Sequence, residues 1–218
     1  MDWSLWLPAL WKGVLDTLYM VGVSTVFTVA LGLPLGVLLV ITERGGLSAS
    51  PAFNQVLGAV VNAARSLPFI ILLVVVIPFT RLLVGTTIGA TAAIVPLSLA
   101  AIPFFARVSE TALREVDRGL VEAAEAMGCT PWQIIRKVLI PEALPSLILG
   151  VALTLISLIG YSAMAGAIGG GGLGDLAIRY GYQRFEPGVM IATVILLIVL
   201  VQGIQALGNA AARRVSRR

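Results

Sequence analysis

Long apolar windows alternate along the chain with short charged stretches. Four windows contain no Asp, Glu, Lys or Arg and are long enough to cross a bilayer: residues 17–42, 82–106, 143–174 and 187–212. A membrane-spanning helix needs about 20 apolar residues, and a charged side chain at its centre costs about 2.5–3.5 kcal/mol on insertion scales. Each window therefore predicts a transmembrane helix.

A fifth apolar segment, residues 66–80, is short for a span and is flanked by Arg65 and Arg81. We expect this span to begin upstream, near Val56, with Arg65 facing protein or water. The pattern thus predicts an all-α, polytopic membrane protein in which residues 1–218 form a single transmembrane domain. The five expected spans cover about 17–42, 56–80, 83–106, 143–168 and 187–212, with a cytoplasmic loop over about 107–142.

Composition supports a membrane protein and argues against an enzyme. Of the 218 residues, 58% are hydrophobic and 12% are charged, whereas an average soluble domain is about 25% charged. The chain has no histidine and one cysteine, Cys129, which excludes Ser–His–Asp and Cys–His catalysts and a cysteine-based zinc site. We therefore expect no catalytic residue, no cofactor and no metal.

The basic side chains predict the orientation of the chain rather than a nucleic-acid surface. The net charge is +4, but Lys and Arg are spread between apolar segments, so we expect no nucleic-acid partner. Cytoplasmic loops are enriched in Lys and Arg, and a cytoplasmic C-terminus with an external N-terminus leaves only Lys12, Arg81, Arg179 and Arg184 outside. The basic residues expected inside are Arg44, Arg65, Arg107, Arg114, Arg118, Arg136, Lys137, Arg213, Arg214, Arg217 and Arg218.

The first span and the segment before it carry three further signals. Trp3, Trp6 and Trp11 suit the membrane–water interface on the external side of the bilayer, because indole rings are enriched at such interfaces. No Lys or Arg precedes Lys12, so we do not expect a cleavable signal peptide. Gly32 and Gly36 have the small-xxx-small spacing that lets two membrane helices approach closely, and we expect them to contact a neighbouring helix.

The loop at 107–142 is expected to be folded. It carries 11 of the chain's 26 charged side chains and is much longer than the about 2–8 residues that connect most helices. Glu110 and Arg114 have the i, i+4 spacing that supports a helix. The Ala- and Glu-rich stretch 120–127 predicts a short helix, and Gly128 follows it where a left-handed residue is favoured.

A second helix is predicted to start directly after this corner. Thr130 is a suitable N-cap, Pro131 occupies the first helical position, and Gln133 completes a capping box. Pro141 should end or bend this helix.

Three apolar residues of the second helix, Trp132, Ile134 and Ile135, are unusual for a solvated loop. Apolar surface of this kind marks an interaction site when it stays exposed. We expect these side chains to bury against the membrane domain or against another protein.

Residues 122–141 resemble the EAA loop of ABC-importer permeases. The matching pattern is Glu122-Ala123-Ala124, three residues, Gly128, nine residues, and Val138-Leu139-Ile140-Pro141, where the family usually has Ile-x-Leu-Pro. In that family the loop is a coupling helix that docks into a cleft on a separate ATPase subunit. The chain has no G-x-x-x-x-G-K-[ST] phosphate loop, so ATP hydrolysis is expected on another polypeptide. The residues expected to couple to the ATPase are Glu122, Ala123, Ala124, Gly128, Trp132 and Pro141.

The resemblance extends over nearly the whole chain to the methionine-import permeases, a branch of that family. It is carried by residues 65–73 (RSLPFIILL), 77–81 (IPFTR), 93–97 (AIVPL) and 160–166 (GYSAMAG). It implies a type I importer fold, a homodimer in a bacterial inner membrane, two copies of an ATPase subunit, and an external binding protein that delivers methionine. Nucleotide binding would close the ATPase pair and switch access of the spans from inside to outside.

The end of the fourth span is the expected outer mouth. A helix that starts near Pro145 reaches Met164 after roughly 28 Å. We expect Tyr161, Ser162 and Met164 to line or close an outer gate, with the flexible Met164 thioether as the plug; simple helix packing is the alternative for Met164. Ser157 is a further pore candidate, although hydroxyl groups in spans commonly bond backbone carbonyls instead. The glycines expected to bend toward the binding protein are Gly169, Gly170, Gly171 and Gly172.

Other functions stay open at this point. Within the same class, the substrate could be another small amino acid or an osmolyte. A passive channel would leave the folded loop at 107–142 unexplained. An intramembrane enzyme would need acidic, basic or His side chains that converge at membrane depth, and four of the five expected spans contain none.

Overall fold

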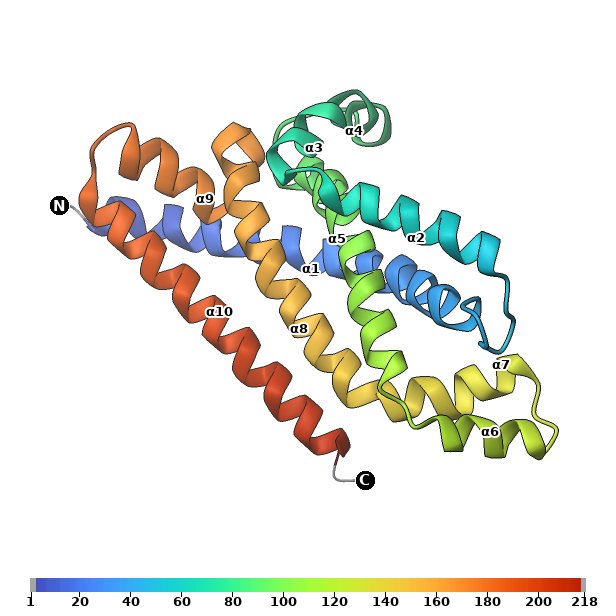
Figure 1. Cartoon of the computed structure of the whole chain (residues 1–218). Coiled ribbons are helices and arrows are strands. Elements are labelled where there is room, and N and C mark those ends of the chain that lie inside the picture. Colours follow the sequence, from blue (N-terminus) through green and yellow to red (C-terminus); the bar gives the residue numbers. More distant parts are fainter. Residues whose placement is uncertain (1–2, 217–218) are drawn as a thin grey trace.

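The structure is a computed structural model that describes residues 3–216, and all of its regular elements are helices (Figure 1). The side chain of Trp3, together with Arg217 and Arg218, lies outside the described part. The elements in chain order are α1 (Trp3–Ile41), α2 (Pro51–Ser66), α3 (Phe69–Val75), α4 (Ile77–Val84), α5 (Ala90–Arg114), α6 (Arg118–Ala126), α7 (Pro131–Ile134), the π-helix η1 (Ile135–Leu139), α8 (Ile140–Ala165), the π-helix η2 (Gly166–Gly170), α9 (Gly172–Leu176), the π-helix η3 (Ala177–Tyr182) and α10 (Pro187–Ser216).

Four helical segments are long and apolar enough to cross a membrane: Trp6–Ile41, Ala90–Arg114, Pro131–Gly170 and Pro187–Ser216. A fifth span is obtained if α2 and α3 are counted together, but these two helices are bent by 99°. The all-helical, multi-span architecture predicted from the apolar windows is therefore confirmed.

The second span is not the continuous helix expected over 56–80. Leu67 leaves the helical region, with φ −77° and ψ 124°, because the ring of Pro68 disfavours helical geometry in the residue before it. Pro68 also lacks the amide hydrogen that a continuing helix would need. The chain therefore turns sharply between α2 and α3.

The other helices are longer than the apolar windows or begin at different residues. α1 begins at Trp3 and carries Lys12 and Asp16 in its first half. The third span was expected from 83, but α4 ends at Val84, its C-cap Gly85 has φ +79°, and α5 begins only at Ala90. At the other end α5 continues to Arg114. A charge-free window marks the apolar part of a helix and not its ends.

α1 and α5 approach one another closely, as the small-xxx-small pair predicted. A Cβ atom built on Gly36 would lie 2.6 Å from the Ser109 Cβ and 2.7 Å from the Ala106 carbonyl oxygen. A Cβ atom built on Gly32 would also have its nearest neighbours on α5, at Ile102 and Phe105. Only glycine at these two positions allows the backbones to come together.

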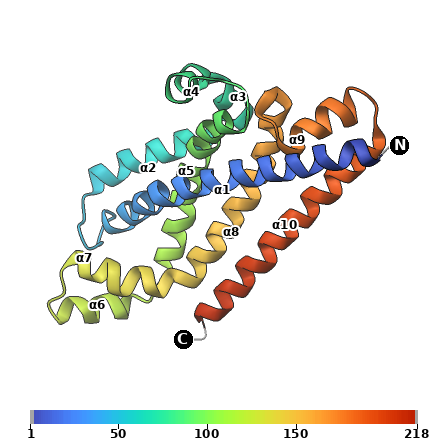
Figure 2. The ribbon, with the colours of Figure 1, turned by 180° about the vertical axis from the view of Figure 1, so that it is seen from behind.

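The main apolar core lies where α1, α5 and α8 meet. Met20, Leu97 and Leu158 are fully buried there. α8 and α10 run side by side in both ribbon views (Figures 1 and 2), with Gly208 against the Ala152 Cβ. The described N-terminal end lies beside the start of α10, and the C-terminal end lies at its other extremity (Figure 2).

Candidate functional site

The loop between α5 and α8 contains the expected short helix and glycine corner. Asp117 caps α6, its carboxylate accepting a hydrogen bond from the Gly119 amide at 2.7 Å. Beyond the end of α6, Gly128 has φ +79°, and the Gly128 and Cys129 amides donate back to carbonyls of α6. The left-handed residue predicted from the sequence is therefore present and closes the helix.

The predicted capping box is also present. The Gln133 amide donates to the Thr130 hydroxyl, and the Thr130 amide donates to the Gln133 side chain at 2.8 Å. Together these bonds satisfy two amide groups at the start of α7 that have no partner within the helix.

Pro141 does not end this second helix. The chain runs from α7 through the π-helical turn η1 into α8, so one helical segment extends over Pro131–Gly170. The Ile140 amide donates to the Ile135 carbonyl, five residues back. A π turn changes the hydrogen-bond register of a helix, and Pro141 follows directly after it. The expected loop over 107–142 is therefore a hairpin between two long helices.

One face of the hairpin packs on the membrane domain. Ala124, Ile134 and Ile135 are buried in a cluster that includes Leu113 of α5 and Leu139 of η1. These contacts join the hairpin to the ends of two membrane-spanning helices.

The opposite face of the hairpin is exposed. Trp132 is 68% exposed and Met127 is 77% exposed, and the side chains of Glu122 and Ala123 also reach the surface. Of the three apolar residues expected to be buried, Trp132 has no covering partner within the described chain. Clustered exposed apolar side chains on a polar segment mark a contact site for another molecule.

Ion pairs and a hydrogen bond tie the base of the hairpin to the turn after α1 and to α2. The buried Glu110 carboxylate lies 2.6 Å from Arg107 and 2.7 Å from Arg114, the pair predicted by spacing. Arg114 also pairs with Glu43, which follows α1, at 2.7 Å. Arg107 donates a further hydrogen bond to the Gly58 carbonyl of α2 at 3.0 Å. These last two contacts could not be predicted from the sequence because their partners are far apart along the chain.

A cavity of about 490 Å³ lies between the turn after α1, the end of α5 and α6. Polar and charged side chains line it, including Glu43, Arg114, Arg118, Glu122 and Glu125. The cavity separates α6 from the turn that follows α1.

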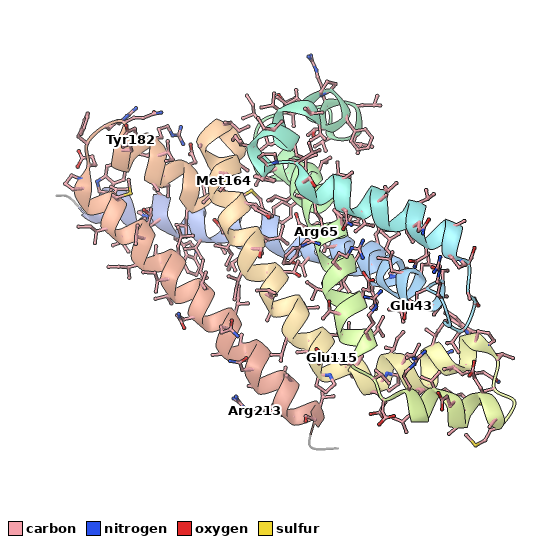
Figure 3. The ribbon with its side chains drawn as sticks, in the orientation of Figure 1. Glu43, Arg65, Glu115, Met164, Tyr182 and Arg213 are labelled. Carbon is pink, nitrogen blue, oxygen red and sulfur yellow. The ribbon has the colours of Figure 1, made fainter. Side chains whose placement is uncertain are left out.

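At the other end of α8, only part of the expected gate set is accessible. Met164 is 48% exposed in the last turn of α8 (Figure 3). Ser162 is buried, and its hydroxyl donates to the Ile159 carbonyl at 2.8 Å. The Ser157 hydroxyl likewise donates to Leu153, at 3.0 Å. Both serines therefore make the backbone contacts that were the alternative to a pore role, and Ser162 lines no open surface.

The glycine run is less exposed than expected. Gly169 and Gly171 are half-buried with positive φ, but Gly170 and Gly172 are buried. A Cβ on Gly172 would lie 2.7 Å from the Thr17 hydroxyl, which accepts a hydrogen bond from the Leu173 amide. Gly170 and Gly172 therefore serve the packing of this turn and offer no surface to a partner, which corrects the expectation for these two residues.

A second cavity, of about 200 Å³, lies where α2 ends beside α5 and α8. Arg65 lines it, with its guanidinium carbon 6.0 Å from the centre of the Phe104 ring. Phe69 and Tyr161 line another wall as a stacked pair, with ring centres 4.7 Å apart and planes 12° apart. The sequence predicts that Arg65 faces protein or water but does not indicate which residues surround it.

Comparison with known proteins identifies the family. The model of the family described as binding-protein-dependent transport system inner membrane component matches residues 32–217. The chain belongs to this family. It is therefore a multi-pass inner-membrane transport permease and not the ATP-hydrolysing subunit.

Several permeases are similar to this one over most of their length. A protein of Vibrio cholerae named probable D-methionine transport system permease MetI is 57% identical over 215 residues, which cover 99% of this permease and 94% of the relative. The Escherichia coli K12 D-methionine permease MetI is 54% identical over 73% of this permease and 75% of its own chain. The Bacillus subtilis methionine permease MetP is 45% identical, with 97% and 96% covered.

Solved structures have the same arrangement of helices. A chain of the MetNI methionine ABC transporter, described as inward facing, superposes on this permease with a TM-score of 0.95, 51% identity, and 96% and 97% of the two chains covered. An amino acid ABC transporter solved with histidines has a TM-score of 0.77 at 22% identity, covering 98% and 97%. The second likeness concerns the fold alone.

Proposed function

We propose that this permease carries methionine across the inner membrane as the transmembrane subunit of an ATP-driven importer. The observation that supports this most strongly is its similarity, over nearly the whole chain, to permeases named for D-methionine or methionine transport. A chain of the MetNI transporter has the same fold as this permease and is 51% identical to it in sequence, which supports the same role.

The proposed assembly contains two copies of this chain, two copies of an ATPase subunit, and an external binding protein that supplies methionine. Five helices enclose little space around a solute, which favours a pathway between two copies. The family is dependent on a binding protein by its description. In this assembly the N-terminus is external, the C-terminus is cytoplasmic, and the hairpin faces the cytoplasm.

We propose that the exposed face of the hairpin docks into a cleft on the ATPase. Glu122, Ala123 and Trp132 present a mixed polar and apolar surface that is free in the chain. Gly128 fixes the corner of the hairpin, and the helix beyond it continues past Pro141 into α8. A displacement of α6 would be transmitted to the ends of α5 and α8 through the packing contacts of Ala124 and Ile134.

We propose that Met164 closes the pathway on the outer side, supported by Tyr161. Met164 is exposed at the point where α8 gives way to the π turn η2. An unbranched thioether can adopt different packing in two states of a gate. Gly169 and Gly171, which have positive φ just beyond this point, shape the surface offered to the binding protein.

Uptake by the reconstituted importer tests this proposal. Proteoliposomes that contain the permease and its ATPase are supplied with binding protein, internal ATP and radiolabelled methionine. We expect ATP-dependent accumulation that unlabelled methionine inhibits and that other amino acids or osmolytes do not. Uptake of another solute that an excess of methionine leaves unchanged would contradict the methionine assignment.

A further inference from the structure

Arg65 is the one charged residue within the five spans expected from the sequence. Its guanidinium faces the ring of Phe104 on α5. In the view of Figure 3, Arg65 lies between Met164 and Glu43, and its side chain is exposed on the described chain. An ionisable residue inside a membrane span marks a functional site or a water-filled pathway.

The guanidinium has no carboxylate partner in the described part of the chain. The ion pairs among residues 3–216 use Arg107, Arg114 and Arg179, and none involves Arg65. Its distance of 6.0 Å from the Phe104 ring is at the outer limit of a cation–π contact. The planar guanidinium, with five N–H donors suited to a carboxylate, therefore remains available.

The cavity beside Arg65 combines this charge with aromatic walls. Its volume is about 200 Å³. Phe104 borders it on α5, and the stacked rings of Phe69 and Tyr161 border it on α3 and α8. Thioether and other apolar side chains make favourable contacts with aromatic rings.

From this juxtaposition we infer that the Arg65 cavity is a transit site for the substrate inside the membrane. It binds a small α-amino acid, with the carboxylate on the Arg65 guanidinium and an apolar side chain against Phe69, Phe104 and Tyr161. This inference rests on the proposed function, because it assumes that an amino acid passes through the permease. The site uses one cation and a few rings, so binding is weak enough for the substrate to leave.

Uptake and ATP hydrolysis by the complete importer in proteoliposomes test the site. The Arg65→Gln variant is expected to lower the initial rate of methionine uptake on the order of tenfold, while ATP hydrolysis stimulated by the binding protein stays within about twofold of wild type. Arg65→Lys keeps the charge but loses the fork geometry and should be intermediate. Arg81→Gln, which changes an exposed arginine on α4 outside the cavity, should behave as wild type.

Direct binding provides a second measurement. The permease–ATPase complex without binding protein is expected to bind radiolabelled methionine, and Arg65→Gln should remove this binding. Methioninamide, which lacks the carboxylate, should not compete. Equal binding by wild type and Arg65→Gln, equal competition by methioninamide, or a parallel loss of uptake and stimulated hydrolysis in Arg65→Gln would each overturn the site.

The outcomes for the site and for the proposed function can be separated. Normal methionine uptake by Arg65→Gln refutes the site and leaves the methionine assignment intact. Uptake of a different amino acid that Arg65→Gln abolishes refutes methionine as the substrate and supports the carboxylate site.

Discussion

The Arg114 guanidinium lies 2.7 Å from the Glu43 carboxylate and thereby connects the end of α5 to the turn that follows α1. The same guanidinium reaches the buried Glu110, which also holds Arg107. The base of the hairpin is thus held by one buried carboxylate between two arginines, with Glu43 as an outer, more exposed partner.

Removing the charge of Glu110 should destabilise the permease more than removing that of Glu43. Glu110→Gln leaves two arginines without their buried acceptor, and we expect a loss of about 1.5–3 kcal/mol, the range for hydrogen bonds to charged groups. Glu43→Gln breaks one partly exposed pair, worth about 0–1 kcal/mol. Thermal unfolding of the two purified variants in the same detergent measures the difference. Equal unfolding temperatures would show that the buried carboxylate is not the central member of the network.

Substitution of Gly128 should uncouple the permease through backbone strain. A Cβ at this position would have no atom within 4 Å, but φ is +79°, and a residue other than glycine in this region costs about 1–2 kcal/mol. We expect Gly128→Val to abolish ATP-driven uptake while the protein still inserts and purifies with its normal yield. Gly128→Asn is the matched variant, because asparagine tolerates the left-handed region, and it should retain most uptake. Loss of uptake in both variants to the same degree would point away from backbone geometry.

Truncation of Met164 should raise ATP hydrolysis that is not accompanied by uptake. Met164→Ala removes the flexible side chain proposed to close the outer side, so the ratio of ATP hydrolysed to methionine taken up should increase. Leu153→Ala is the control, because Leu153 lies three turns earlier on the same face of α8 and is 49% exposed, close to the 48% of Met164. An unchanged ratio in Met164→Ala, measured in proteoliposomes, would assign this residue to packing alone.

Gly36 and Gly22 offer a paired test of the α1–α5 contact. A Cβ on Gly36 would be 2.6 Å from Ser109, whereas a Cβ on Gly22 would meet nothing within 4 Å. Gly36→Ala should therefore cost about 1–3 kcal/mol, as overpacking does, and Gly22→Ala should change stability by less than about 0.5 kcal/mol. Thermal unfolding in detergent compares the two. Similar stability of both variants would mean that the helices separate without cost at Gly36.

Much of the hairpin could be predicted because its signals are local. The Thr130–Gln133 capping box, the left-handed Gly128 and the Glu110–Arg114 pair each depend on residues within four positions of one another. The break after α2 was missed, although Pro68 signals it, because the apolar run on both sides favoured a single span.

The sequence by itself determined the helical, membrane-spanning class and the folded hairpin, because apolar windows and helix caps are set by neighbouring residues. The tertiary structure decided which side chains meet: Arg114 with Glu43, 71 residues apart, Thr17 with Leu173, 156 apart, and Arg65 with the rings around its cavity. In the tertiary structure Ser162, Gly170 and Gly172 are buried, so they do not lie on the surfaces where the sequence predicted them. Such contacts depend on the crossing points of whole helices, and no local pattern encodes where those points fall.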